Sequence, residues 1–246
     1  MKNRSEQIAQ LKNQAFDCLI IGGGASGAGC ALDSTLRGYK TALIDKADFA
    51  AATSSRSTKL IHGGVRYLEQ AITRLDFGQL AQVRHGLKER HLLLKNAPHL
   101  AQPLPLITPV FSWLEGLYFM IGLKLYGWFA DQKDTLPASE WLGKKELFKR
   151  MPRLSRRIHS GVLYYDGQLD DARYCLSILQ TAANAGASLA NYTELEGFEK
   201  NNDGKIEAVR VRDMQTGECF TIRAKVIINC TLAFTAILYG NWLTQR

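Results

Sequence analysis

The feature that most constrains the fold is an apolar strand followed at once by a glycine-rich turn and a helix. The strand is DCLII (residues 17–21), the helix is ASGAGCALDSTLRG (residues 25–38), and a second strand, KTALI (residues 40–44), ends at Asp45. The turn fits the pattern G-x-G-x-x-G with Gly22, Gly24 and Gly27. Such a turn lets the backbone approach a pyrophosphate at a helix N-terminus, and a carboxylate after the second strand accepts from a ribose hydroxyl. We therefore predict a βαβ unit that binds a dinucleotide; the alternative is a glycine turn that serves packing alone.

A run of small hydroxyl residues follows this unit. Residues 53–69 are TSSRSTKLIHGGVRYLE. Its hydroxyls and backbone amides can bind a pyrophosphate or a ring system, and Gly63 and Gly64 let the backbone pass close to a flat ring. In isolation such a run is most often a solvated connector, but its place just after Asp45 favours the binding role.

Composition bounds the remaining possibilities. With 246 residues, 46% of them hydrophobic, the chain can bury the core of one large domain or two small ones. The net charge of +8 favours an anionic partner such as a phosphorylated metabolite, a lipid surface or nucleic acid. The basic run GKKELFKRMPRLSRR (residues 143–157) contains no nucleic-acid-binding motif. We interpret it as a solvated or membrane-facing surface and expect no nucleic-acid partner.

The cysteines and the amino end carry little functional signal. The five cysteines contain no C-x-x-C pair, and we expect free buried thiols in a reducing compartment rather than disulfides. The histidines have no metal-ligand spacing, so no metal site is predicted. Residues 1–15 are polar, lack the apolar core of a secretory signal, and predict a short leader helix.

Residues 111–130, FSWLEGLYFMIGLKLYGWFA, form the longest apolar region. Glu115 and Lys124 interrupt it, which argues against a membrane span. A helix would place a set of apolar side chains on one face, namely Leu114, Leu117, Tyr118, Ile121 and Leu125. We favour a buried core helix, and contact with a lipid surface is the alternative.

The remaining pattern completes an α/β fold. A charged amphipathic helix is predicted over residues 76–95, and a proline-containing extended segment follows. A strand and a helix that ends at Gly186 come next, and then four short strands in a meander. The expected ranges are 103–110, 161–166 and 170–186, and for the meander 195–200, 205–213, 219–224 and 225–229.

Residues 16–69 resemble the amino-terminal FAD-binding region of FAD-dependent glycerol-3-phosphate dehydrogenases of the aerobic and mitochondrial type. Later segments that fit the same family are APHLAQPLPLITPV, GLKLYGW, YYDGQLDDAR and RAKVIIN. The resemblance implies an FAD-binding Rossmann-like fold of the glutathione reductase and D-amino-acid oxidase type, with a partial inserted substrate domain. It also implies transfer of a hydride from sn-glycerol 3-phosphate to FAD, which yields dihydroxyacetone phosphate, and passage of the electrons to a membrane quinone.

The resemblance assigns roles residue by residue. The positions that match the family's ADP-binding residues are Gly22, Gly24, Ala25, Ser26, Gly27, Asp45 and Lys46. Those that match its flavin-side loop are Thr53, Ser54, Ser57, Lys59, Leu60, His62 and Gly63. Arg66 and Tyr67 match residues that hold the substrate phosphate, which an arginine fork suits. His62 is the candidate catalytic base, and a hydrogen bond to the flavin is the rival role.

The pattern departs from the family after VIIN. The family continues with an alanine, threonine and glycine turn, whereas this chain continues CTLAFTAILYGNWLTQR, with Cys230 in place of the alanine and Leu232 in place of the glycine. We therefore expect a leader over residues 1–15, an incomplete FAD-binding domain with an inserted substrate-binding segment over 16–231, and a divergent tail over 232–246. The resemblance predicts a flavoenzyme, possible complementation by a separate carboxy-terminal chain, and a cytoplasmic place, peripheral on the inner membrane rather than mitochondrial. The alternative is an inactive remnant or a module that binds only the ADP moiety.

Overall fold

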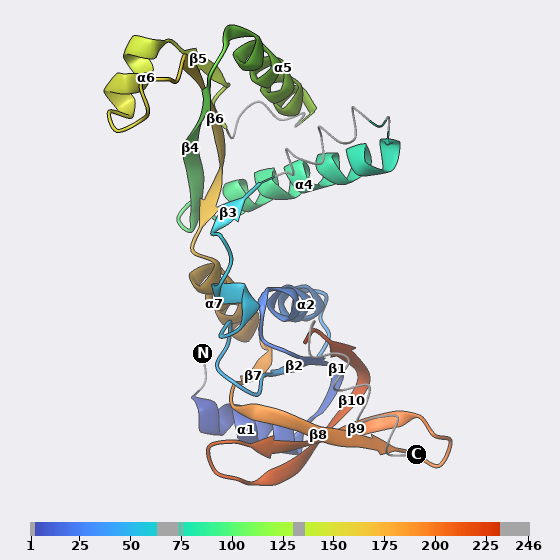
Figure 1. Ribbon diagram of the computed structural model, residues 1–246. Coiled ribbons are helices and arrows are strands. Elements are labelled where there is room, and N and C mark those ends of the chain that lie inside the picture. The colour runs from blue at the N-terminus through green and yellow to red at the C-terminus, as the bar shows by residue number, and fades with distance from the viewer. Residues whose placement is uncertain (1–2, 63–73, 75, 130–135, 232–246) are drawn as a thin grey trace. The chain divides into compact units, whose positions relative to one another are not determined.

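The computed structural model describes residues 3–62, 74, 76–129 and 136–231 (Figure 1). The chain divides into two compact units. Unit 1 comprises residues 1–57 and 171–246, and unit 2 comprises residues 58–170. Each unit contains its own sheet and its own hydrophobic cluster. Unit 2 is therefore an insertion in the sequence of unit 1.

Unit 1 is built on a six-stranded mixed sheet. The strands lie in the order β7 (Ser188–Ala190), β2 (Thr41–Ile44), β1 (Ala15–Ile21), β10 (Cys219–Asn229), β9 (Ile206–Asp213) and β8 (Thr193–Lys200). β7, β2 and β1 pair in parallel, whereas β8, β9 and the first half of β10 form an antiparallel meander. The α/β class predicted from the βαβ pattern is confirmed.

Strand β10 corrects one expectation. The sequence predicted separate strands over 219–224 and 225–229, but a single strand runs through both ranges. Its first half pairs antiparallel with β9, and its second half pairs in parallel with β1 up to Ile21↔Asn229. The charged residues Arg223 and Lys225 interrupt the apolar pattern because they are exposed, not because the strand ends there. The strand changes partners without a turn.

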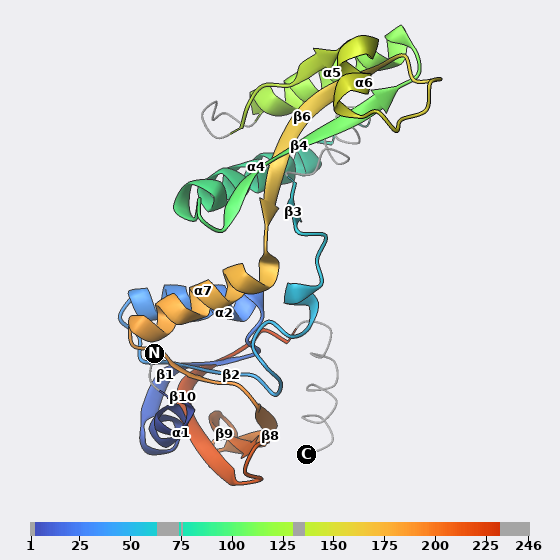
Figure 2. The same cartoon turned by 90° about the vertical axis from the view of Figure 1, so that its left-hand side faces the viewer.

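Alternate side chains of the parallel strands serve two different cores, as the pleat of a strand requires. Helices α2 (Ala25–Leu36) and α7 (Asp171–Asn184) lie side by side on one face of the sheet, where Ile20 and Leu43 pack against them (Figure 2). The opposite face meets helix α1 (Arg4–Asn13), and the buried residues there include Leu11, Leu19, Ile21, Ile44 and Val209. The glycine turn between β1 and α2 is thus supported by packing on both faces.

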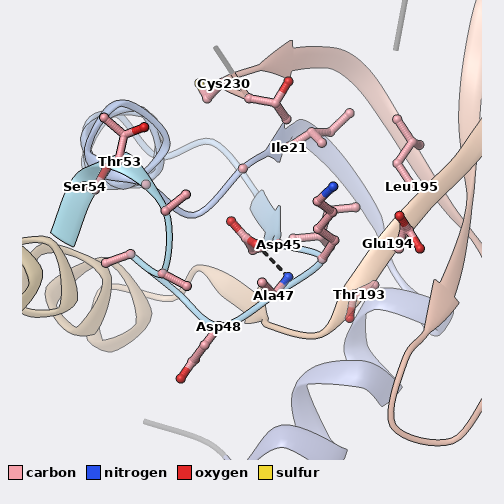
Figure 3. A pocket seen from close by; sticks show the side chains of 18 of the residues that line it. Ile21, Asp45, Ala47, Asp48, Thr53, Ser54, Thr193, Glu194, Leu195 and Cys230 are labelled. Atoms are coloured by element: carbon pink, nitrogen blue, oxygen red, sulfur yellow. Dashed lines mark hydrogen bonds between the residues drawn. The ribbon is translucent and has the colours of Figure 1, made fainter. Parts of the chain in front are cut away.

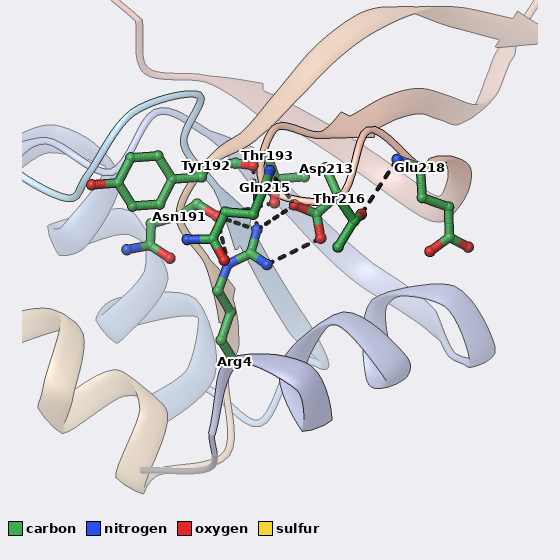
Figure 4. Close-up of polar contacts among 8 residues, drawn as sticks. All are labelled: Arg4, Asn191, Tyr192, Thr193, Asp213, Gln215, Thr216 and Glu218. Carbon is green, nitrogen blue, oxygen red and sulfur yellow. Dashed lines mark hydrogen bonds and ion pairs between the residues drawn. The ribbon is translucent and has the colours of Figure 1, made fainter.

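Arg4 of helix α1 makes several polar contacts with the rest of unit 1 (Figure 4). The Arg4 guanidinium donates to both carboxylate oxygens of Asp213, at 3.0 and 2.8 Å, and to the backbone carbonyls of Asn191 and Tyr192. The hydrogen bond from Arg4 holds the pKa of Asp213 below its usual value. The helix expected within residues 1–15 is present, and its Ile8 and Leu11 side chains belong to the core of unit 1.

Unit 2 contains a small antiparallel sheet centred on β6 (Ser160–Leu169). β6 pairs with β4 (Ala101–Val110) over its full length, and also with β3 (Leu60–Ile61) and β5 (Glu140–Leu142). Among the strands that the structure describes, β4 pairs only with β6, so it is an edge strand. This position explains how β4 accommodates its three prolines, because an edge strand leaves one row of backbone groups outside the ladder.

Three helices of unit 2 lie in residues 76–129 and 136–170. Helix α4 (Phe77–Asn96) begins at Asp76, whose side chain accepts from the backbone N–H groups of Gly78 and Gln79, and α6 (Lys144–Arg150) follows β5. Helix α5 (Trp113–Phe129) packs through Gly116, where an added Cβ would come within 2.2 Å of the Trp141 ring. The absent side chain of Gly116 therefore allows α5 to approach β5 closely.

The buried-helix interpretation of residues 111–130 is wrong for the face that the sequence selected. Leu114, Tyr118 and Ile121 are 71%, 56% and 51% exposed, whereas Leu123 on another face is buried. The apolar pattern identified the helix, but periodicity alone does not determine which side meets the core.

The cysteine prediction is also corrected in part. All five cysteines are free, as expected, but only Cys175 is buried; Cys219 is exposed and the other three are half-buried. Cys219 begins β10 on the antiparallel side of the sheet, where alternate side chains face solvent.

Candidate functional site

A pocket of about 390 Å³ lies in unit 1 at the carboxyl ends of β1 and β2 (Figure 3). In open parallel sheets this edge is where ligands bind. Six predicted site residues line the pocket together, namely Gly22, Gly24, Asp45, Lys46, Thr53 and Ser54. The structure therefore brings together the glycine turn, the end of β2 and the start of the hydroxyl-rich run.

The glycine turn has the geometry that requires glycine. Gly22 has φ +108°, a conformation that side chains disfavour. A Cβ on Gly27 would come within 1.8 Å of the carbonyl oxygen of Gly22, so only glycine allows α2 to start this close to β1. Gly24 is the N-cap of α2, makes no side-chain capping bond, and no acidic residue occupies the first helical turn. This helix N-terminus suits an anion, because the first turn of α2 exposes backbone N–H groups and the positive end of the helix dipole and carries no acidic side chain of its own.

The hydroxyl-rich run reaches this helix N-terminus. Its first residues form a short 3₁₀ turn, η1 (Thr53–Ser55). The Oγ of Ser54 accepts from the backbone N–H of Ala25 at 2.8 Å, and a Cβ on Gly24 would come equally close to that oxygen. Ser54 therefore caps α2 from a separate loop.

Asp45 is held in the pocket by two backbone donors. Its Oδ2 accepts from the N–H of Gly23 at 2.7 Å. Its Oδ1 accepts from the N–H of Ala47 at 2.8 Å (Figure 3). Each carboxylate oxygen has two lone pairs, so one acceptor position on each remains for a ligand hydroxyl. The two bonds fix the carboxylate orientation before any ligand arrives.

Sequence reasoning missed the opposite wall of the pocket. Thr193, Glu194 and Leu195 of β8 line it, and two further lining residues that the sequence did not indicate are Asp48 and Arg56. The start of β8 lies beside the end of β2 because the N–H of Thr193 donates to the carbonyl of Asp45 at 2.7 Å and that of Tyr192 to Ala47. No local pattern signals this contact, since about 150 residues separate the two segments.

A buried thiol lies behind the glycine turn. The Sγ of Cys175, on α7, contacts the carbonyl oxygen of Gly23 at 3.7 Å. Burial, and secondarily the charge of Asp45, raises the pKa of Cys175 to about 11. A thiol that stays protonated is a poor nucleophile, so Cys175 serves packing rather than chemistry.

The other predicted residues lie elsewhere. Ser26 is exposed in the first turn of α2, and the backbone N–H of Ser57 donates to Asp171 at 2.9 Å. Lys59, Leu60 and His62 belong to unit 2; Lys59 has φ +60°, and its Nζ lies 3.8 Å from Asp170. Three predicted residues fall outside the described residues, namely Gly63, Arg66 and Tyr67.

His62 lies next to a buried ion pair within unit 2. Arg90 of α4 and Asp166 of β6 are paired, with side chains only 7% and 5% exposed. β3 pairs with β6 through Ile61↔Gly167, so continuing this register by one residue places His62 opposite Asp166. Burial raises the pKa of Asp166, and the charges of Arg90 and then His62 oppose that shift. The candidate catalytic histidine thus has a charged neighbour that the sequence did not reveal.

The described part of the chain lacks two kinds of feature. Within it, no group of three or more His, Cys, Asp or Glu side chains is arranged to hold a metal ion. Its helices also include none that is both long enough and apolar enough to cross a membrane.

Comparison with known proteins decides the family. The family model described as FAD dependent oxidoreductase matches residues 17–243. The chain belongs to this family. It is 47% identical over 240 residues to the mitochondrial glycerol-3-phosphate dehydrogenase of Bos taurus. The matched region covers 95% of this chain and 33% of that protein. The Caenorhabditis elegans protein named probable glycerol-3-phosphate dehydrogenase, mitochondrial, is 48% identical over 237 residues, and the match again covers 33% of that protein.

Solved structures agree with this assignment. The glycerol-3-phosphate dehydrogenase of Bacillus halodurans, complexed with FAD, matches with a TM-score of 0.71 and 30% identity, over 97% of this chain and 38% of that one. The L-α-glycerophosphate oxidase of Mycoplasma pneumoniae, with FAD bound, shares the fold with a TM-score of 0.65 at 19% identity. The resemblance, the FAD-binding fold class and the FAD-dependent family are confirmed. The chain spans about a third of the length of the curated relatives that it matches.

Proposed function

We propose that unit 1 of this chain binds FAD through its ADP half. The observation that carries the proposal is the pairing, in one pocket, of the glycine turn at the N-terminus of α2 with the oriented carboxylate of Asp45. The pyrophosphate would lie against Gly22, Gly24 and the first turn of α2, and a ribose hydroxyl would donate to Asp45. Glycines that admit no Cβ are what a close backbone approach needs, so the pocket residues fit the cofactor.

For the whole protein we propose oxidation of sn-glycerol 3-phosphate to dihydroxyacetone phosphate, with electrons passed to a quinone. The identity of 46–47% to glycerol-3-phosphate dehydrogenases supports this choice within the family. FAD, when bound, supplies the hydride acceptor. His62 would act at the reacting centre, where it would either remove a proton or donate a hydrogen bond. Arg66 and Tyr67 would hold the substrate phosphate. We propose a complementing carboxy-terminal chain as a further partner.

The test is substrate-dependent bleaching of the bound flavin. The purified chain is loaded with FAD without oxygen, and sn-glycerol 3-phosphate is added, with glycerol as the control. We expect bleaching by the phosphorylated substrate alone, with the chain itself or with the remaining two thirds of a relative supplied in trans. The second candidate function is a module that binds the ADP moiety without catalysis. The predominance of ADP-side residues in the pocket favours it. FAD binding without bleaching, both with and without the added chain, would support this second candidate.

The Asp45 assignment is tested by a cycle that changes both protein and ligand. Wild-type protein should bind ADP about 1–3 kcal/mol more tightly than 2′-deoxy-ADP, because the deoxy ligand cannot donate to the carboxylate. Asp45→Asn removes the negative charge of the acceptor. The affinities for ADP and 2′-deoxy-ADP should therefore differ by no more than about twofold in this variant. Calorimetric titration of the four combinations measures the coupling.

The matched control is Asp48→Asn, an acidic residue of the same pocket with no assigned role at the ribose. It should keep the full preference for ADP. An unchanged preference in Asp45→Asn would remove Asp45 from the ribose site.

We also propose that the protein associates peripherally with a membrane, where a quinone acceptor would reside. The exposed apolar face of α5 supports this, together with the net charge of +8, which favours anionic lipid. The curated relatives from Bos taurus and Caenorhabditis elegans are named as mitochondrial proteins, and the compartment of this chain stays a prediction.

Two charges on this face should disrupt lipid binding. The double variant Leu114→Glu, Ile121→Glu should lower partition into anionic vesicles at least about tenfold, since each buried aliphatic side chain contributes about 1.5–3 kcal/mol. The control is Leu36→Glu, Leu176→Glu, which alters two equally exposed leucines of unit 1. An equal loss of vesicle binding in both double variants would contradict the proposal. Binding of the α5 face to the remaining two thirds of a relative, instead of to lipid, would also contradict it.

A further inference from the structure

Two thiols far apart in the sequence touch at the rim of the dinucleotide pocket. The Sγ of Cys230 lies 4.0 Å from the Sγ of Cys30. Cys30 is on α2, and Cys230 directly follows β10 and lines the pocket. The backbone N–H of Cys230 donates to the carbonyl of Ile21 at 2.8 Å, so the end of β10 is held beside β1. The juxtaposition is therefore part of the folded core rather than a chance contact of loose segments.

The distance is close to what a covalent bond requires. A disulfide needs the sulfurs about 2.05 Å apart, so the pair must close by about 2 Å, a movement within reach of side-chain rotation. The remaining cysteines are placed differently: Cys175 contacts the carbonyl of Gly23, and Cys219 lies at the opposite end of β10. Cys18, on β1, is the competing partner, because its pKa is raised mainly by burial but also by neighbouring Cys30.

We propose that Cys30 and Cys230 are a thiol pair that small disulfides such as oxidised glutathione convert to an intramolecular disulfide, which ties α2 to the end of β10. In the first step the Cys30 thiolate attacks one sulfur of oxidised glutathione, which forms a mixed disulfide and releases one glutathione thiolate. In the second, the Cys230 thiolate attacks the Cys30 sulfur of the mixed disulfide and releases the second glutathione. Two protein thiols are oxidised, one glutathione disulfide is reduced to two glutathione thiols, and the two protons pass to solvent and the released thiolates.

The environment sets the order of these steps. Burial, with Cys30 as a neighbour, raises the pKa of Cys230 to about 11. A thiol with so high a pKa is a poor first nucleophile towards a dissolved oxidant. It is well placed for the second step, where the mixed disulfide is held within contact distance and the reaction is intramolecular. Cys30 therefore opens the sequence and Cys230 completes it.

The experiment uses the folded chain in native buffer with excess oxidised glutathione. Loss of free thiols is counted, and peptide mass spectrometry after digestion without reductant locates the bond. We expect two of the five thiols to be lost, a Cys30–Cys230 peptide within single chains, and full reversal by dithiothreitol. The oxidised chain should also unfold at a higher urea concentration than the reduced chain, because the bond closes a long loop.

Matched variants separate this pair from its competitors. Cys230→Ala, which places there the alanine of the resembling family, should stop at the mixed disulfide of glutathione with Cys30. Cys18→Ala and Cys219→Ala should still form the Cys30–Cys230 bond at the wild-type rate within about twofold. A Cys18–Cys30 bond, bonds only between chains, or a Cys30–Cys230 bond that forms only in urea would overturn the proposal. None of these outcomes depends on whether the pocket binds FAD.

Discussion

Asp166→Ala should destabilise unit 2 by about 3–5 kcal/mol. The variant leaves the guanidinium of Arg90 inside unit 2 without its carboxylate, and Arg90 itself is only 6% exposed. A guanidinium cannot escape this cost by losing its proton, because its pKa lies too high. Urea unfolding followed by tryptophan fluorescence measures the loss, since Trp113, Trp128 and Trp141 fall in unit 2.

The reverse variant should behave differently with pH. In Arg90→Met the charge that opposes the burial of Asp166 is gone, so the folded-state pKa of Asp166 should rise further above its ordinary value of 3.8. The folded state then binds more protons than the unfolded state between these two values, and stability falls as the pH rises through that window. Arg90→Met should therefore be more stable at about pH 5 than at about pH 8, whereas Asp166→Ala should lack this dependence.

The exposed pair Glu146–Arg150 of α6, which lies in the same unit as these tryptophans, supplies the control for both variants. Its side chains are 45% and 40% exposed, so Glu146→Ala should leave the urea midpoint almost unchanged. A loss for Asp166→Ala as small as that control would show that the buried pair contributes little to the stability of unit 2.

Gly27→Ala should abolish the ADP site. The added Cβ would lie 1.8 Å from the carbonyl oxygen and 3.0 Å from the carbonyl carbon of Gly22, both backbone atoms of the turn itself. Relief requires α2 to move away from β1, which we expect to cost about 3 kcal/mol of stability and to lower ADP affinity more than about a hundredfold. Calorimetric titration and urea unfolding measure the two effects.

Gly29→Ala is the matched control in the same helix. A Cβ there meets nothing within 4 Å, so the substitution should stabilise α2 by about 0.5–1 kcal/mol and leave ADP affinity unchanged. Equal behaviour of the two variants would mean that the close approach at Gly27 does not shape the site.

Local patterns in the sequence predicted the βαβ unit well. The apolar strands, the glycine turn and the helix ending before Gly38 depend on neighbouring residues, and the structure confirms them within two residues. The same locality explains why Asp45, Ser54 and the glycine turn were expected in one place. The part of the site that these residues form could therefore be predicted from the sequence.

The errors arose where distant segments decide the outcome. The exposed face of α5 follows from packing at Gly116 against Trp141, which periodicity cannot indicate. The second pocket wall, at Glu194, depends on the contact of β8 with the end of β2, and the Arg90–Asp166 pair joins α4 to β6. Each needs the assembled fold, because residues far apart in the chain carry no shared local signal.

The central claim, that unit 1 holds FAD by its ADP half, is tested most directly by calorimetric titration of the chain with FAD, ADP and FMN. FAD and ADP both carry the adenosine and pyrophosphate that the pocket would bind, whereas FMN carries only the flavin side. We expect FAD and ADP to bind at one site with dissociation constants within about tenfold of each other, and FMN to show no binding. Binding of FMN as tight as that of FAD, with none of ADP, or binding of none of the three, would contradict the claim.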